Sequence, residues 1–214
     1  GIVGLAREFG LILFADEIYD RMVMDGKEHT ALASLAPDLL TVSFNGLSKS
    51  HRVAGFRIGW MCLAGDKSRA EGYIQGLNLL ASMRLCSNVP GQSIIQTALG
   101  GYQSCDEYLR PGGRIYEQRE YICKAISEIP GLSAVRPDAA FYIFPKIDTN
   151  YYDIENDEDF AFELLREKKV LITRGTGFNL KTHDHFRIVF LPDVIQLEEA
   201  MERIADFLAT KRRH

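Results

Sequence analysis

The sequence predicts an α/β protein, and three observations support that fold class. Short apolar runs of strand length alternate with helical patterns in the first 65 residues, and the two patterns alternate again after residue 131 without an internal repeat. Hydrophobic residues make up 46% of the chain and charged residues 25%, which is typical of a globular protein. A chain of 214 residues is long enough for one or two domains with a buried core.

The predicted elements of the first part are a helix and three strands. Apolar residues at helical spacing place the chain inside a helix from its second residue. Three apolar runs of strand length follow, at residues 11–15, 40–44 and 58–64. Continuous apolar strands are buried on both faces of open α/β sheets, whose functional residues gather at the carboxyl ends of the strands. Asp16 and Lys49 both follow such strands.

The middle of the chain, residues 66–129, is predicted to be mostly helical, and the Pro-Gly-Gly turn at 111–113 is predicted to link two domains. We therefore expect a first domain over residues 1–111 and a second over residues 112–214. The second domain is predicted to end in a helix from Val194, with the preceding aspartate as its N-cap. Its other predicted elements are a strand at 140–144, a helix at 158–168, and strands at 170–173 and 185–191.

Charge and motif content argue against several classes of partner. The net charge of −4 gives no basic field for nucleic acid, and no apolar run approaches the roughly 20 residues that span a bilayer. The four cysteines form no CxxC pair, which favours reduced thiols and a cytoplasmic location. His183 and His185 have a metal-ligand spacing, but polar loops often contain such pairs, so we expect no metal site. The chain begins with glycine inside a helical pattern, which suggests a piece of a longer protein.

The segment from Ser43 to Gly59 is the most informative part of the sequence. A predicted strand runs into a loop of small residues that presents Lys49 between two serines, of which Ser48 comes first. Arg57 follows eight residues later, so a hydroxyl and a guanidinium could hold a phosphate beside the lysine amine. The alternative is a surface loop with a solvated lysine, because lysine side chains are mostly exposed.

A carboxylate and a phenol lie upstream of that loop. Asp16 ends an apolar strand and Tyr19 follows three residues later. A buried carboxylate needs a cationic partner, and a protonated pyridine nitrogen would be one. The alternative is that Asp16 caps a helix or lies at a solvated strand end.

Arg187 is a candidate anion-binding residue because of its place in a predicted strand. In the predicted strand at 185–191, Phe186 and Ile188 share one face, while Arg187 shares the other with Val189. A lone guanidinium on an apolar surface should have an anion as its partner. The alternative is an arginine that extends to solvent.

With these motifs, the chain resembles the pyridoxal-phosphate (PLP) aminotransferases of fold type I, class I/II. The resemblance runs along essentially the whole chain, and the lysine segment is worded most like the bacterial alanine (glutamate–pyruvate) aminotransferases. It implies that the chain holds the C-terminal part of a large PLP-binding domain, with a mostly parallel sheet in three αβα layers, and a smaller C-terminal α/β domain. The motifs that carry it are FADEIY at 14–19, GLSK at 46–49, GFRIG at 55–59 and HFRIV at 185–189.

The resemblance also implies residue roles. Lys49 would form the Schiff base with PLP and then carry the proton between the substrate Cα and the cofactor C4′. Asp16 would pair with the pyridine nitrogen and keep the ring an electron sink, and Tyr19 would donate to the phenolic oxygen. Ser48 and Arg57 would hold the cofactor phosphate. Several relatives carry a hydroxyl residue at position 46, so the glycine there could contact the phosphate only through its backbone. Arg187 would bind the α-carboxylate of the substrate bidentately.

The implied reaction moves an amino group between an L-amino acid, with alanine or glutamate favoured, and a 2-oxo acid such as pyruvate or 2-oxoglutarate. The resemblance further implies a homodimer, and it implies that these 214 residues alone are inactive because part of the site lies outside them. Three alternatives stay open: another fold-type-I enzyme such as a C–S lyase or synthase, an aspartate or aromatic aminotransferase, and a non-catalytic regulator with the PLP fold.

Overall fold

A computed structural model describes residues 1–213. By its internal contacts the chain forms two compact units, one over residues 1–106 and one that begins at Glu107. Each unit is α/β, as the sequence predicts. That they are the later part of a cofactor-binding domain and a small domain stays a prediction. Among the described residues, no helix combines the length and the apolar character that crossing a bilayer requires.

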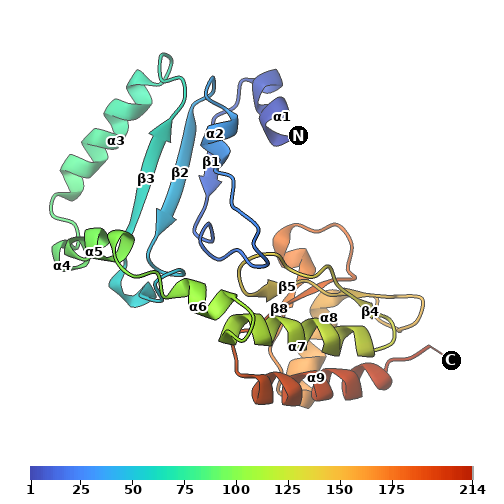
Figure 1. Cartoon of the computed structure of the whole chain (residues 1–214). Coiled ribbons are helices and arrows are strands. Elements are labelled where there is room, and N and C mark those ends of the chain that lie inside the picture. Colours follow the sequence, from blue (N-terminus) through green and yellow to red (C-terminus); the bar gives the residue numbers. More distant parts are fainter. Residues whose placement is uncertain (214) are drawn as a thin grey trace. The chain divides into compact units, whose positions relative to one another are not determined.

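The first unit is built on a mixed three-stranded sheet in the order β1-β2-β3 (Figure 1). Its strands are β1 (Leu13–Asp16), β2 (Thr41–Gly46) and β3 (Gly59–Ala64). The strands β1 and β2 run parallel, whereas β3 runs antiparallel to β2. The connection from β2 to β3 contains only a turn and the 3-10 helix η1 (Ala54–Phe56), without the longer crossover helix that usually joins parallel strands.

Packing on β1 differs from the expected burial on both faces. Leu13 is buried in a core cluster with Ala6 of α1 (Ile2–Phe9) and with Ala36, which follows α2 (Leu32–Leu35). Phe14 points to the other face and is 58% exposed. The expectation that β1 is buried on both faces is therefore wrong for the described residues, because side chains alternate between faces along a strand and only one face is covered.

The helical character of residues 66–129 is confirmed. Pro90 is the second residue of a short helix that begins at Val89, and Asn88 caps that helix by accepting a hydrogen bond from Gly91 N at 3.1 Å. Proline suits this position because the first helical N–H groups have no partner inside the helix. The helices are α3 (Glu71–Arg84), α4 (Val89–Ser93), α5 (Ile95–Gly100), α6 (Cys105–Leu109) and α7 (Arg114–Glu128).

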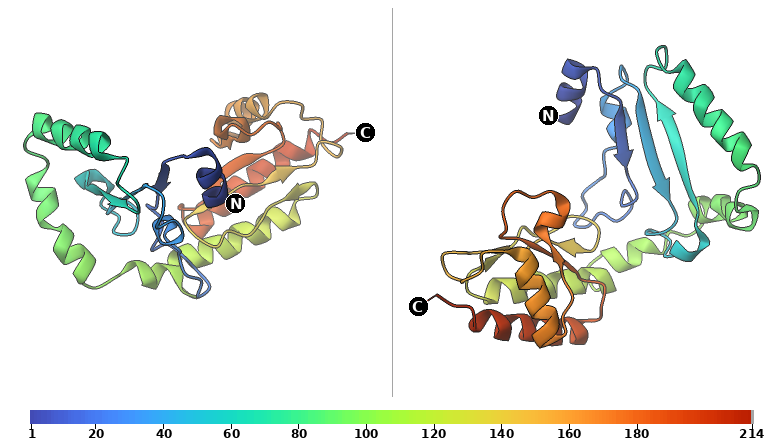
Figure 2. Two further views of the ribbon diagram at one scale, coloured as in Figure 1. Left: turned by 90° about the horizontal axis from the view of Figure 1, so that it is seen from above. Right: turned by 180° about the vertical axis from the view of Figure 1, so that it is seen from behind.

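The second unit packs α7, α8 and α9 with two small antiparallel sheets. The helices α7 and α9 lie side by side (Figures 1 and 2). One sheet has the order β5-β8-β7, and the other pairs β4 with β6. The bounds are β4 (Leu132–Ser133), β5 (Tyr142–Ile143), β6 (Lys146–Ile147), α8 (Asp157–Lys168), β7 (Thr173–Arg174), η2 (Gly175–Phe178), β8 (Phe186–Val189) and α9 (Val194–Ala209).

The last helix begins where the sequence predicts. Asp193 is its N-cap and accepts a hydrogen bond from Gln196 N at 2.9 Å. The apolar stripe of α9 includes Phe207, which is fully buried with its ring centroid 5.8 Å from that of Phe160. Phe160 in turn lies 5.4 Å from the ring of Phe186 in β8, so one aromatic cluster joins two helices and the sheet.

Candidate active site

Three residues predicted for the site lie at or next to strand ends on one edge of the first sheet. Asp16 is the last residue of β1, Lys49 follows β2, and Arg57 precedes β3. Because β1 and β2 are parallel and β3 is antiparallel, these ends all lie at the same edge of the sheet. Backbone hydrogen bonds hold the edge together, from Glu17 N to Phe44 O at 2.9 Å and from Leu47 N to Ile58 O at 3.2 Å.

Lys49 lies on a tight turn fixed by its neighbours. His51 N donates to Leu47 O at 3.3 Å, which closes the turn around the lysine. The ring of His51 bridges two groups, with Nε2 2.9 Å from Ala98 O and Nδ1 2.9 Å from Ser50 Oγ. A carbonyl oxygen can only accept, so Nε2 donates to Ala98 O. These bonds anchor the lysine turn to helix α5.

Asp16 is exposed, and no helix begins at it. Its Oδ1 accepts a hydrogen bond from Ile18 N at 3.3 Å. The helix-cap alternative is therefore wrong, and the carboxylate lies at an open strand end. Tyr19 is half-buried in the turn that follows, where its carbonyl accepts from Met22 N at 2.9 Å.

The two groups predicted to hold a phosphate lie on either side of the β2–β3 connection. Ser48 is half-buried. Arg57 is exposed in the left-handed conformation, with a φ of 53°, and its Nη1 donates to Ala54 O at 2.7 Å. Gly46 is the last residue of β2, where a Cβ would be only 2.6 Å from Ile58 O. The close approach of Ile58 leaves little room for a side chain at position 46.

Arg187 lies in β8 of the second unit, and its guanidinium sits against two aromatic rings. Its Cζ is 4.6 Å from the ring centroid of Tyr142 and 4.8 Å from that of Phe178. Such distances favour cation–π attraction. The Nε of Arg187 is buried and has no hydrogen-bond partner among the residues that the structure describes. This half-buried cation, held by rings, is suited to an anionic ligand.

Sequence reasoning missed the two rings beside Arg187 and the carboxylate of Asp157. The signal for Tyr142 was its place in a predicted strand, but the pairing of β5 with β8 was needed to bring it to Arg187. Asp157 opens α8, and its side chain is fully buried. Nothing in the local pattern distinguishes Asp157 from Asp159, which lies two residues later in the same helix and is exposed.

The two histidines considered as metal ligands contact different carboxylates. His183 Nδ1 lies 3.3 Å from Asp157 Oδ1, while His185 Nδ1 lies 2.7 Å from Asp184 Oδ1. Within residues 1–213, no group of three or more candidate ligands is arranged to hold a metal ion. The carboxylates instead serve as hydrogen-bond acceptors for the imidazoles.

The lysine turn, the carboxylate at a neighbouring strand end and the arginine before the next strand lie at one edge of an α/β sheet. In the comparison with known families, the model for aminotransferase class I and II matches residues 1–204. The chain belongs to the class I and II aminotransferase family.

Relatives and solved structures support this assignment. The chain is 57% identical to a glutamate-pyruvate aminotransferase, AlaA, of Haemophilus influenzae over 99% of its own length and 52% of the relative. It is 50% identical to an alanine aminotransferase of Mycobacterium tuberculosis over 99% of its length and 49% of that protein. The crystal structure of an aminotransferase from Escherichia coli matches with a TM-score of 0.95 and 54% identity, covering all of this chain and 53% of that one. The chain thus spans about half the length of these relatives.

PLP is the cofactor of this family. The donor set at the sheet edge suits it: an amine for the aldehyde, a carboxylate for the ring nitrogen, a phenol for the ring oxygen, and a hydroxyl with a guanidinium for the phosphate. Groups of these kinds are carried by the candidate residues Lys49, Asp16, Tyr19, Ser48 and Arg57.

Proposed function

We propose that this chain forms the later part of a PLP-dependent aminotransferase that acts on an L-amino acid and a 2-oxo acid. Alanine or glutamate would be the amino donor, and pyruvate or 2-oxoglutarate the acceptor. The observation that carries the proposal is that Asp16, Lys49 and Arg57 lie at or next to strand ends on one edge of the sheet. The names of the relatives support the choice of substrates.

Lys49 is the catalytic residue of this proposal. PLP, when bound, supplies an electron-accepting ring conjugated to the substrate nitrogen. The lysine amine anchors the cofactor covalently and then moves the proton at the substrate Cα. Its turn is tied to α5 through His51, so the amine works from a fixed backbone.

The other residues orient the cofactor. Asp16 keeps the ring nitrogen protonated by charge pairing, and Tyr19 donates a hydrogen bond to the ring oxygen. Ser48 and Arg57 bind the phosphate, with Gly46 contributing at most its backbone.

Arg187 binds the α-carboxylate of the substrate through its guanidinium. All amino acids and 2-oxo acids share that carboxylate, so loss of Arg187 should weaken every substrate alike. Tyr142 and Phe178 hold the guanidinium against their rings, and its N–H groups bind the ligand.

The working enzyme would be a cytoplasmic homodimer whose polypeptide is about as long as the relatives. Since this chain spans about half of them, we expect the isolated 214 residues to have little or no activity. A C–S lyase or synthase would use the same lysine and aspartate, and a regulator with this fold would bind PLP without turnover.

The test uses the full-length protein, by which we mean this chain together with the part that its relatives have in addition. It is incubated with PLP and reduced with borohydride, and the modified peptide is mapped by mass spectrometry. We expect a pyridoxyl group on Lys49 and, in product analysis with alanine and 2-oxoglutarate, pyruvate and glutamate.

Two variants serve as controls. Lys49→Ala should abolish both the label and the activity, whereas Lys67→Ala, in an exposed loop, should change neither. Labelling spread over many lysines of the folded protein would refute the proposal. Labelling of Lys49 with release of ammonia from the substrate would favour the lyase alternative.

A further inference from the structure

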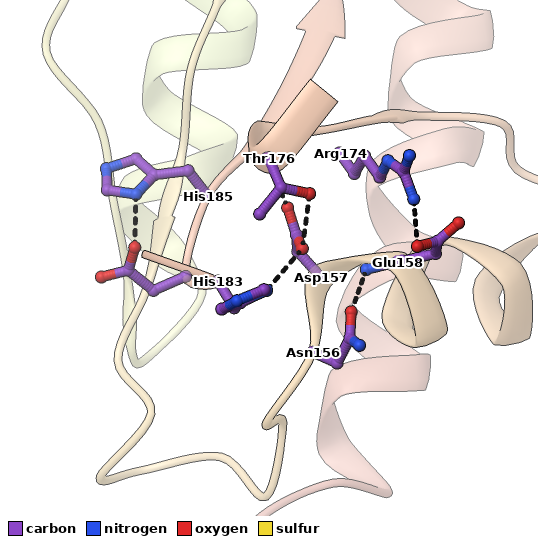
Figure 3. Close-up of polar contacts among 8 residues, drawn as sticks. Asn156, Asp157, Glu158, Arg174, Thr176, His183 and His185 are labelled. Carbon is purple, nitrogen blue, oxygen red and sulfur yellow. Dashed lines mark hydrogen bonds and ion pairs between the residues drawn. The ribbon is translucent and has the colours of Figure 1, made fainter. Parts of the chain in front are cut away.

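The side chain of Asp157 is fully buried and is satisfied by groups outside its own helix. Its Oδ2 accepts from Thr176 N at 2.8 Å and its Oδ1 from Thr176 Oγ1 at 3.0 Å (Figure 3). His183 Nδ1 lies 3.3 Å from Oδ1. Burial alone would raise the pKa of Asp157, but these hydrogen bonds outweigh burial and hold the pKa below its ordinary value.

Helix α8 does not need this carboxylate as a cap. Asn156 already caps the helix by accepting from Glu158 N at 2.8 Å. Asp159 adds a further negative charge to the first turn, where it interacts favourably with the helix dipole. The hydrogen bonds of Asp157 therefore hold the η2 turn and not the start of α8.

Hydrogen bonds hold the first two residues of the η2 turn. Its first residue, Gly175, donates from N to His185 O at 2.9 Å, just before β8. Its second residue, Thr176, is held by Asp157. Arg174, immediately before the turn, forms an ion pair with Glu158 of α8 (Figure 3). The turn is thus pinned between α8 and the start of β8.

The last residue of the turn reaches Arg187. The ring of Phe178 lies 4.8 Å from the guanidinium carbon and meets the ring of Phe144 edge-on at 5.9 Å. Since Nε of Arg187 has no hydrogen-bond partner among the described residues, the rings of Phe178 and Tyr142 are what orients this guanidinium.

We propose that Asp157 is a positioning residue for substrate binding: through Thr176 it holds the η2 turn so that Phe178 packs on Arg187 and aims its guanidinium at a carboxylate ligand. This inference rests on the carboxylate-binding role proposed for Arg187. Asp157 itself touches neither cofactor nor substrate in this scheme.

The experiment compares Asp157→Asn with Asp159→Asn in the full-length holoenzyme. The two changes remove the same charge two residues apart, but only Asp157 contacts the η2 turn. Propionate is the binding probe, because it has a carboxylate and no amino group and so binds without reacting. Its dissociation constant is measured by calorimetry, alongside kcat and the KM values for alanine and 2-oxoglutarate.

We expect Asp157→Asn to raise the dissociation constant of propionate and both KM values about tenfold, as for loss of one well-placed charged contact. The kcat value and the amount of bound PLP should stay within about twofold of the wild type, because the sheet edge that carries Lys49 is unchanged. The control Asp159→Asn should match the wild type in every measurement. An unchanged propionate affinity in Asp157→Asn would overturn the inference.

A double-mutant cycle separates positioning from a general loss of stability. In an Arg187→Lys background, Asp157→Asn should have less than about a twofold further effect on propionate binding, because both changes act on one group. Effects that multiply fully would overturn the inference.

A second pair of variants covers the case in which Asp157→Asn does not fold. Thr176→Val removes the hydroxyl contact and should weaken propionate binding. Thr176→Ser keeps the hydroxyl and should bind propionate as the wild type does. Equal binding by both would contradict the inference. Propionate binding that depends on Arg187 and Asp157 in a protein without transaminase activity would refute the proposed reaction and leave the positioning role standing.

Discussion

The η2 turn contains two glycines whose replacement by alanine should have opposite effects. A Cβ at Gly175 would lie 2.8 Å from His185 O and 2.9 Å from His185 Cβ. A Cβ at Gly177 would come no closer than 3.6 Å to any other atom, the nearest being Arg174 Cγ. Neither glycine has a positive φ, so both positions accept the alanine backbone. Only space distinguishes them.

The cost at Gly175 follows from what must move. The obstructing oxygen belongs to backbone next to β8, so the turn must shift and lose the 2.9 Å hydrogen bond from Gly175 N to His185 O. Overpacking costs about 1–3 kcal/mol, and the lost hydrogen bond about 0.5–1.5 kcal/mol. The smaller backbone entropy of unfolded alanine returns about 0.4–1 kcal/mol. Gly175→Ala should therefore lower the free energy of unfolding by about 0.5–4 kcal/mol, whereas Gly177→Ala should leave it unchanged or raise it by up to about 1 kcal/mol.

Urea unfolding of the full-length protein, followed by circular dichroism, measures the free energy of unfolding of each variant relative to the wild type. We expect the dependence of that free energy on urea concentration to be the same for all three proteins. Propionate binding by the same variants adds a second readout, because a shifted turn moves Phe178 away from Arg187. We expect weaker binding for Gly175→Ala and unchanged binding for Gly177→Ala. Equal unfolding midpoints for the two variants would refute the packing argument, since they differ only in the space around the new methyl group.

Three further predictions concern the core, the lysine edge and acid stability. Phe207→Ala should lower the free energy of unfolding by about 3–5 kcal/mol in urea titrations, and the control Phe162→Ala, at a side chain that is 60% exposed, by less than about 0.5 kcal/mol. Gly46→Ser should weaken PLP binding in an absorbance titration, because its Cβ would meet Ile58 O at 2.6 Å; tighter binding would show that the hydroxyl reaches the phosphate instead. The pKa of Asp157 is lower in the folded chain than in the unfolded one, so its contribution to stability is complete above the unfolded pKa, about 3.9, and is lost as the pH falls through the folded value. The difference in thermal midpoint between the wild type and Asp157→Asn should therefore shrink below about pH 4, and a difference that grows there would contradict this.

The sequence correctly predicted those elements that depend only on residues close together in the chain. The start of α9 follows from Asp193, whose side chain caps the helix wherever that helix packs. The apolar run at 170–172 also looked like a strand, yet only Thr173 and Arg174 pair with β8, and Leu171 is 78% exposed. Strand bounds depend on where the partner strand runs, and a pattern within one segment does not contain that information.

The candidate site divides in the same way. The sequence placed Asp16 and Lys49 at strand ends, and the parallel pairing of β1 with β2 puts those ends at one edge. For Arg187 the sequence predicted a lone cation in need of an anion, but not the rings that hold it. Phe178 reaches the guanidinium through a turn fixed by Asp157, and such a chain of tertiary contacts has no periodicity to detect.

The two groups of functional residues are therefore positioned by different means, and this decides which substitutions they tolerate. At the lysine edge, backbone hydrogen bonds and strand pairing set the geometry, so changes that disturb main-chain spacing, as at Gly46, should be more harmful than changes of neighbouring side chains. At Arg187, the geometry depends on neighbouring side chains and on the η2 turn that Asp157 holds, so replacing one carboxylate oxygen of Asp157 by an amide nitrogen should weaken carboxylate binding although the strand pairing is unchanged. Substitutions beside Lys49 should accordingly affect PLP binding and the proton step together, while those around η2 should affect the affinity for carboxylates alone.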